Sequence, residues 1–205
     1  MGYKGRGLGK REDGIEEALT AEDLDVKLQE KEVDTLVFSS SITKGISTNG
    51  FNKLYKGKTA KFHKFHGRNA AEIKEYMPVN LRKTDPKTVV ILASGNGIPT
   101  GNKCSLQQLE QTVKDVVSSG TLCKEYGVQK VFISSFLPRR SAFYQSRRFH
   151  LNKMLRAECI ANDFIFLENK NIELQKHLSD DGVHLNTKGS SMLCRNIANM
   201  LNAEG

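Results

Sequence analysis

The chain has 205 residues, 38% of them hydrophobic and 26% charged, and carries a net charge of +8. This length suits one α/β domain with an appendage, and the apolar fraction excludes an intrinsically disordered chain. The longest apolar runs are far shorter than a membrane span, and the start of the chain lacks the apolar segment of a secretory signal, so we expect an intracellular protein, cytoplasmic or nuclear.

The first 32 residues have the composition of an arm. Residues 2–9 hold four glycines, too many for a packed element, and acidic residues dominate 12–32. The run Met1-Gly2-Tyr3-Lys4-Gly5-Arg6-Gly7-Leu8-Gly9-Lys10, with Gly14-Ile15 after it, resembles part of a G-patch, a short motif of RNA-processing proteins that engages RNA helicases. The resemblance implies an RNA helicase as a partner; a flexible basic tail is the alternative.

A regular alternation begins at Asp34 and extends through the domain that we expect over residues 33–205. Segments of helical period separate five strand-like runs, at 34–38, 59–65, 88–93, 129–135 and 163–167. This alternation predicts an α/β fold of three layers, with a doubly wound parallel sheet of five strands covered by helices on both faces. The run 88–93 is the most apolar and is expected at the centre of the sheet.

Helix start signals support this interpretation. Asn69 with Glu72, and Ser105 with Gln108, have the spacing of capping boxes and precede apolar residues at helical period. A last helix is expected to begin at Thr187.

Two basic stretches contain no acidic residue. The first carries Lys53, Lys56, Lys58, Lys61 and Lys64, with aromatic residues between them, and the second includes Arg139, Arg140, Arg147, Arg148, Lys153 and Arg156. Cations with interleaved aromatic rings suit phosphate contact and base stacking, so RNA or another nucleic acid is a candidate partner. We assign this role to the five lysines with Arg147 and Arg148. His63 and His66 are expected on a solvated basic face, and Pro138-Arg139-Arg140 either clamps an anionic group or is a simple loop.

The four cysteines lie far apart, and none forms a Cys-x-x-Cys pair. Reduced structural thiols are therefore expected, with no metal site and no cofactor.

Polar residues follow the strands at the edge where ligands bind in open parallel sheets. Ser41 follows the first strand, Gly67 the second and Asn96 the third, while Asp181 and His184 lie in the last long loop. A serine, a histidine and a carboxylate are the groups needed for nucleophilic acyl transfer, and a glycine N–H with an asparagine amide suits an oxyanion. Each residue also has a plainer interpretation: serines after a strand cap turns, a histidine between apolar residues is structural, and an aspartate caps the following turn.

Three segments together resemble the conserved blocks of the SGNH (GDSL-type) hydrolases. They are Val37-Phe38-Ser39-Ser40-Ser41-Ile42-Thr43-Lys44-Gly45, Val89-Val90-Ile91-Leu92-Ala93-Ser94-Gly95-Asn96-Gly97-Ile98 and Asp181-Gly182-Val183-His184-Leu185-Asn186. The pattern is closest to the esterase-like domains of some retrotransposon-derived animal proteins. The resemblance implies a flavodoxin-like sheet and hydrolysis of a small carboxylic ester.

Carried over position by position, the resemblance makes Ser41 the nucleophile, His184 the base and Asp181 its orienting group. The Ser41 and Gly67 N–H groups and the Asn96 side chain then form the oxyanion hole. The Gly-Asp-Ser of the family is Ser39-Ser40-Ser41 here, and its Gly-x-Asn-Asp is Ser94-Gly95-Asn96-Gly97. Two acids that brace these loops are therefore missing, and the alternative to an esterase is a catalytically weak or inactive module of the same fold that binds RNA.

Overall fold

A computed structural model describes residues 33–93, 95–98 and 104–204; the G-patch-like segment and the rest of residues 1–32 lie outside them. The described chain forms one parallel sheet of five strands in the order β2-β1-β3-β4-β5. The strands are β1 (Thr35–Ser39), β2 (Ala60–Lys64), β3 (Thr88–Ile91), β4 (Lys130–Ser134) and β5 (Ile165–Leu167). The expected doubly wound α/β architecture is confirmed, with the apolar β3 at the centre of the sheet.

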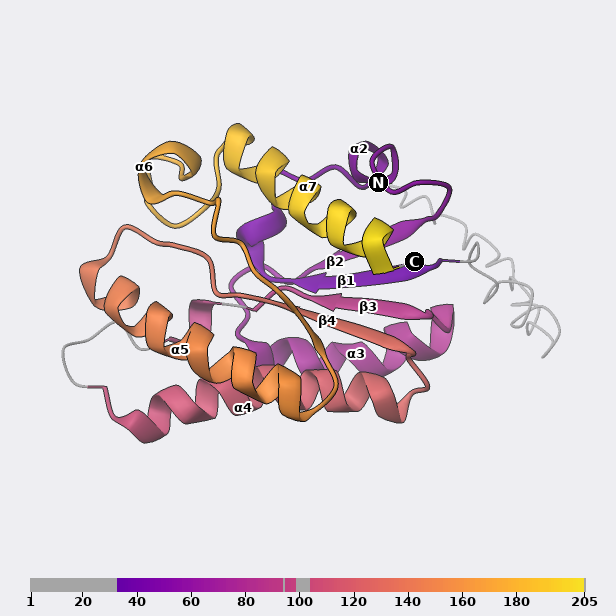
Figure 1. The fold of residues 1–205 in the computed structure, drawn as a ribbon, viewed down its shortest axis with the longest axis horizontal. Coiled ribbons are helices and arrows are strands. Elements are labelled where there is room, and N and C mark those ends of the chain that lie inside the picture. Colours follow the sequence, from indigo (N-terminus) through magenta and orange to yellow (C-terminus); the bar gives the residue numbers. More distant parts are fainter. Residues whose placement is uncertain (1–32, 94, 99–103, 205) are drawn as a thin grey trace, which may run out of the picture.

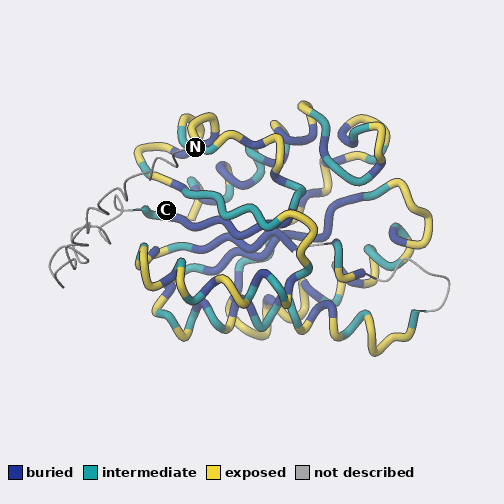
Figure 2. The backbone as a smooth tube through the Cα atoms, turned by 180° about the vertical axis from the view of Figure 1, so that it is seen from behind, coloured by how far each residue is buried: buried dark blue, intermediate teal, exposed yellow. Residues whose placement is uncertain are grey.

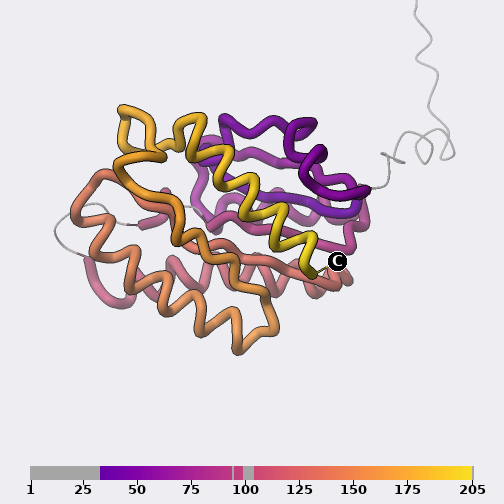
Figure 3. The backbone as a smooth tube through the Cα atoms, turned by 45° about the horizontal axis from the view of Figure 1, so that its top comes forward, coloured from indigo at the N-terminus to yellow at the C-terminus, as the bar shows by residue number. Residues whose placement is uncertain are grey.

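Helices cover both faces of the sheet and complete three layers (Figure 1). They are α2 (Thr48–Asn52), α3 (Ala70–Thr84), α4 (Leu106–Glu125), α5 (Ala142–Ala161), α6 (Leu174–His177) and α7 (Thr187–Glu204), with 3₁₀ turns η1 (Ser41–Thr43) and η2 (Gly95–Gly97). Helices α3, α4 and α5 pack side by side on one face, while α7, yellow in Figure 3, runs across the other. Among the described helices, none combines the length and apolarity that crossing a membrane requires.

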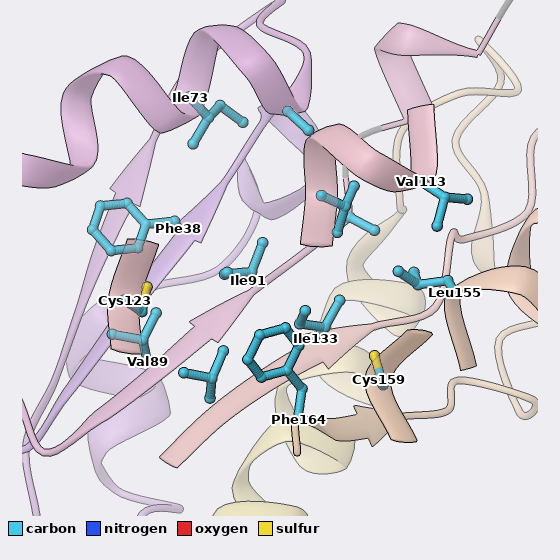
Figure 4. Close-up of a cluster of buried hydrophobic side chains, with 14 of the residues drawn as sticks. Phe38, Ile73, Val89, Ile91, Val113, Cys123, Ile133, Leu155, Cys159 and Phe164 are labelled. Carbon is cyan, nitrogen blue, oxygen red and sulfur yellow. The ribbon is translucent and has the colours of Figure 1, made fainter. Parts of the chain in front are cut away.

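Alternation along the strands divides the core into two clusters. Leu36 and Phe38 on β1 point into the cluster under α3, α4 and α5, part of which Figure 4 shows, whereas Val37 points into the cluster under α2 and α7. Because both faces are covered, β1, β3 and β4 are buried along most of their length, as the dark blue centre of Figure 2 shows. This is why the strands read as continuous apolar runs in the sequence.

The helix start signals are confirmed at atomic level. The Asn69 side chain accepts a hydrogen bond from the Glu72 N–H, and the Glu72 carboxylate accepts one from the Asn69 N–H; Ser105 and Gln108 make the same reciprocal pair at the start of α4. Ser141 caps α5, and the helix begins at Ala142. The segments that follow the strands hold polar side chains at the carboxyl edge of the sheet.

The cysteines are free thiols, as expected. Burial raises the pKa of Cys123 and of Cys159 to about 12, so both are uncharged and act as packing groups in the core.

Candidate active site

The first strand delivers Ser41 to the carboxyl edge of the sheet. β1 ends at Ser39, Ser40 has extended backbone, and Ser41 opens the 3₁₀ turn η1. Ser39 and Ser40 are buried, whereas Ser41 is partly exposed. The buried hydroxyls of Ser39 and Thr43 lie 2.5 Å apart and tie the turn to the end of the strand. Of the three consecutive serines, Ser41 therefore presents its hydroxyl to the surface.

The last loop places His184 and Asp181 beside that hydroxyl. His184 Nε2 lies 2.9 Å from Ser41 Oγ, and His184 Nδ1 lies 2.7 Å from Asp181 Oδ2. The other carboxylate oxygen, Oδ1, accepts hydrogen bonds from the Val183 and His184 N–H groups at 2.8 and 2.9 Å. Asp181 therefore caps its turn with one oxygen and contacts the imidazole with the other, so the structure contains the contacts that both interpretations of this residue require.

The protonation of Asp181 decides which histidine tautomer is present. Hydrogen bonds from the His184 ring, from the His184 N–H and from the Val183 N–H lower the pKa of the Asp181 carboxyl well below its usual range. The carboxylate is thus ionised at neutral pH and only accepts, so Nδ1 carries the hydrogen. In the neutral imidazole, Nε2 then presents its lone pair to the Ser41 hydroxyl.

Gly67 and Asn96 border the same cleft, which has a volume of about 540 Å³. Gly67, with φ +74°, forms the turn between β2 and α3. The Asn96 carboxamide is held at both ends: Nδ2 donates to the Arg68 carbonyl at 3.1 Å, and Oδ1 accepts from Arg139 at 2.7 Å. A carbonyl acceptor at one end and a guanidinium donor at the other assign the nitrogen and the oxygen of the Asn96 carboxamide.

Arg139 is a site residue that the sequence interpretation missed. Its guanidinium lies over the Tyr144 ring at 5.0 Å, and the Tyr144 hydroxyl donates to the Leu137 carbonyl. Gly95 makes room for this arrangement, because a Cβ there would come within 2.5 Å of the Tyr144 hydroxyl oxygen. Arg139 lies in the loop before α5, and its guanidinium donates to Asn96.

Arg140 joins the same loop to the segment that carries His184. Its guanidinium donates to the Asp180 carbonyl at 2.7 Å and to the Ser179 carbonyl at 3.4 Å, and its N–H donates to the Gly182 carbonyl at 2.7 Å. Two neighbouring arginines thus support two different parts of the site. No local sequence signal distinguishes the two arginines, because their partners lie in two other segments that are distant in the sequence.

No family model and no curated protein matches the sequence. Solved structures do match. A GDSL-like lipase from Bacteroides thetaiotaomicron superposes with a TM-score of 0.67 at 20% identity, over 84% of this chain and 89% of that one. The lipase/acylhydrolase from Enterococcus faecalis gives a TM-score of 0.68 at 15% identity, over 84% and 97% of the two chains. A catalytic mutant of Axe2, an acetylxylan esterase from Geobacillus stearothermophilus, gives 0.65 at 12% identity, over 84% and 95%.

The chain has the SGNH hydrolase fold. Within this fold, Ser41, Gly67, Asn96 and His184 border one cleft together with Lys44, His66 and Val183, which the sequence interpretation did not assign to it. His66, expected on a solvated basic face, lies in the cleft because β2 ends at Lys64 and the chain turns toward Gly67. Its position two residues after a strand end is the signal that would have found it.

The predicted nucleic-acid residues do not form one surface in the SGNH fold. Lys53, Lys56 and Lys58 lie between α2 and β2, and Lys61 and Lys64 lie on β2, at one edge of the sheet, whereas Arg147 and Arg148 lie on α5, which packs against β5 at the other edge. Lys64 is further committed to the Ile46 carbonyl, to which its ammonium group donates.

Proposed function

We propose that this protein is a serine esterase that hydrolyses small carboxylic esters. The observation that carries the proposal is the continuous hydrogen-bonded chain from Ser41 through His184 to Asp181, in which both side-chain contacts are shorter than 3 Å. A serine hydroxyl is a weak nucleophile near neutral pH unless a base accepts its proton, and this chain supplies the base and the group that orients it. The SGNH fold and the names of its structural neighbours support the assignment.

The acylation step follows from the tautomer. His184 Nε2 takes the Ser41 proton while Ser41 Oγ attacks the ester carbonyl carbon, and the carbonyl electron pair moves onto oxygen. Asp181 stays ionised and stabilises the imidazolium through Nδ1–H. As the tetrahedral intermediate collapses, Nε2–H returns the proton to the leaving alkoxide, so an alcohol departs and an acyl-serine remains. Water, deprotonated by the same nitrogen, then attacks the acyl-serine. As this second tetrahedral intermediate collapses, Nε2–H returns the proton to Ser41 Oγ and the acid departs.

The developing oxyanion needs donors that are already oriented. We assign these to the Ser41 and Gly67 N–H groups and to Asn96 Nδ2, which border the cleft that contains the Ser41 hydroxyl. Loss of one such donor typically lowers kcat by about 10²–10³-fold. The cleft volume of about 540 Å³ is in the range of small-molecule sites, which favours a small ester.

The test compares Ser41→Ala with Ser40→Ala, because the two hydroxyls are adjacent and only one contacts His184. We expect wild type and Ser40→Ala to react with a fluorophosphonate probe and to hydrolyse p-nitrophenyl acetate. Ser41→Ala should lose the label and at least about a thousandfold in kcat/KM, since the nucleophile and base act as a unit. Absence of labelling in folded wild type, or activity that survives Ser41→Ala, would contradict the proposal.

RNA binding by the five lysines together with Arg147 and Arg148 stays a prediction. A single short strand does not engage both groups at once without passing around the sheet, because they lie at its opposite edges. The helicase partner depends on residues 1–15, which lie outside the described residues.

A further inference from the structure

A second cavity, of about 520 Å³, lies between α5 and the end of β5 and shares no residue with the esterase cleft. Its lining consists of Ser135, Arg148, Phe149, Asn152, Lys153, Arg156, Phe166, Glu168, Asn169, Lys170 and Ile172. Four of these side chains are cationic and one is anionic, so the lining carries a net charge of +3. Such a concentration of positive charge around a concave site attracts an anionic ligand.

Part of this charge is already compensated. Glu168 accepts from Arg156 and from Lys170, the latter at 3.0 Å. Arg148 is different: its Nε–H is buried and has no hydrogen-bond partner within the described part of the chain. A buried donor left unpaired costs free energy, so Arg148 holds its positive charge at the cavity without full compensation. Burial also lowers the pKa of the Arg148 guanidinium, in keeping with a cation that lacks a counter-charge.

The cavity also offers flat apolar surfaces. Phe149 is 69% exposed, unusually open for a phenylalanine, and the Arg148 guanidinium lies 4.7 Å from its ring centre. Arg156 lies in the same way over Phe166, at 4.6 Å. Arginine beside an exposed ring is the combination with which proteins bind a phosphate and stack an adjoining base.

The polar floor of the cavity is rigid. Asn152 exchanges two hydrogen bonds with the Phe136 backbone, and the buried Asn169 donates to Ser135 Oγ from its backbone and side chain. Since Ser135 Oγ accepts from Asn169, its own hydrogen is directed elsewhere and is available to a ligand. The floor is thus built before any ligand arrives, which lowers the entropy cost of binding.

We propose that this cavity binds a nucleotide, with its phosphate on Arg148 and its base against the exposed face of Phe149. A free nucleotide and the terminal nucleotide of a single strand present the same chemistry. The site is independent of the esterase proposal, since it uses neither Ser41 nor His184.

Calorimetric titration of the full chain at about 50 mM salt tests the proposal with four probes: adenosine 5′-monophosphate, adenosine, inorganic phosphate and an oligoadenylate of about ten nucleotides. We expect the monophosphate or the oligonucleotide to bind at least about tenfold more tightly than adenosine or phosphate, because base and phosphate contacts act together. Saturation by the monophosphate identifies a free nucleotide as the source. Binding of the oligonucleotide alone identifies a strand.

Variants locate the site. Arg148→Gln should weaken nucleotide binding by at least about tenfold through the loss of a charge-assisted contact. Phe149→Ala, whose side chain is exposed and not needed for folding, should weaken nucleotide binding about tenfold and leave phosphate binding unchanged. Lys114→Gln, which removes one positive charge from an exposed position on α4 outside the cavity lining, should bind as wild type.

Two results would overturn the proposal. One is the absence of nucleotide binding at about 1 mM ligand. Phosphate binding as tight as that of the nucleotide counts in the same way, because it indicates an adventitious ion only. The other is equal weakening by Arg148→Gln and Lys114→Gln in variants that keep the wild-type melting temperature, because this locates binding in general surface charge.

Discussion

At the scale of single residues, the candidate active site replaces missing carboxylates by other contacts. Ser40 occupies the position of the aspartate in the Gly-Asp-Ser block. The turn is stabilised instead by the hydrogen bond between the Ser39 and Thr43 hydroxyls. The position of the acid after Asn96 is Gly97, and the Asn96 amide is held by Arg139. In this structure, hydroxyl groups and a guanidinium support the two loops in which the SGNH pattern, which the sequence resembles, has carboxylates.

In the proposed esterase, Arg139 is a positioning residue whose effect passes through Asn96. We expect Arg139→Gln to lower kcat about tenfold or more and to leave KM nearly unchanged, because an oxyanion donor contributes in the transition state. In an Asn96→Ala background, the same change should cost almost nothing further, since residues that act through one another are not additive. Kinetics of the two single variants and the double variant provide the measurement.

Arg147→Gln is the control for loss of a neighbouring guanidinium, because Arg147 lies over Phe143 on α5. Equal kinetic losses in Arg139→Gln and Arg147→Gln would contradict the positioning role, as would full additivity with Asn96→Ala.

At the scale of elements, the two capping boxes have the same local chemistry and different neighbours. The box that starts α3 follows Gly67 and Arg68, whose carbonyl accepts from Asn96, and a Cβ at Gly97 would lie 3.5 Å from the Asn69 Cβ. At the start of α4, neither Ser105 nor Gln108 of the capping box lines the candidate cleft. Position in the fold, not the capping chemistry, decides which helix start matters for function.

Asn69→Ala and Ser105→Ala should each reduce the free energy of unfolding by about 1 kcal/mol, the usual cost of a lost N-cap. Only Asn69→Ala should also lower kcat, because the first turn of α3 holds the Arg68 carbonyl and Gly67 in place. Urea unfolding and ester kinetics on both variants test this expectation. A larger loss of kcat in Ser105→Ala than in Asn69→Ala would be the contrary result.

At the scale of the molecule, one sheet separates two apolar clusters that do not share side chains. Ile73 on α3 is buried in one cluster and Ile197 on α7 in the other. The sheet between them is connected by parallel ladders throughout. We therefore expect the two halves of the core to be energetically independent at the level of single contacts, yet to unfold as one unit.

Ile73→Val and Ile197→Val should each cost about 0.5–1.5 kcal/mol, and the double variant should equal their sum within about 0.5 kcal/mol. Thermal and urea unfolding, followed by both near-UV and far-UV circular dichroism, should give a single coincident transition. Coupling above about 1 kcal/mol, or separate transitions from the two probes, would show that packing on one face depends on the other.

The sequence by itself determined the elements and their class, because their causes are local. A continuous apolar run bounded by polar residues is enough to predict β3 as a central strand, and the reciprocal groups of Asn69 and Glu72 lie three positions apart. The resemblance carried by Ser41, Asn96, Asp181 and His184 further predicted which segments contribute to a candidate site, and in the structure Ser41, Asn96 and His184 border one cleft.

Only the tertiary structure decided the contacts between those ends. Ser41 and His184 are 143 positions apart, and Asn96 and Arg139 are 43 apart, so no local pattern specifies that their atoms come within 3 Å. Strand order places the five lysines and Arg147 with Arg148 at opposite edges, although both stretches look alike as sequence. Residue types and periodicity indicate the secondary structure that each segment prefers. The contacts between segments depend instead on the strand order of the sheet and on which of its faces are buried.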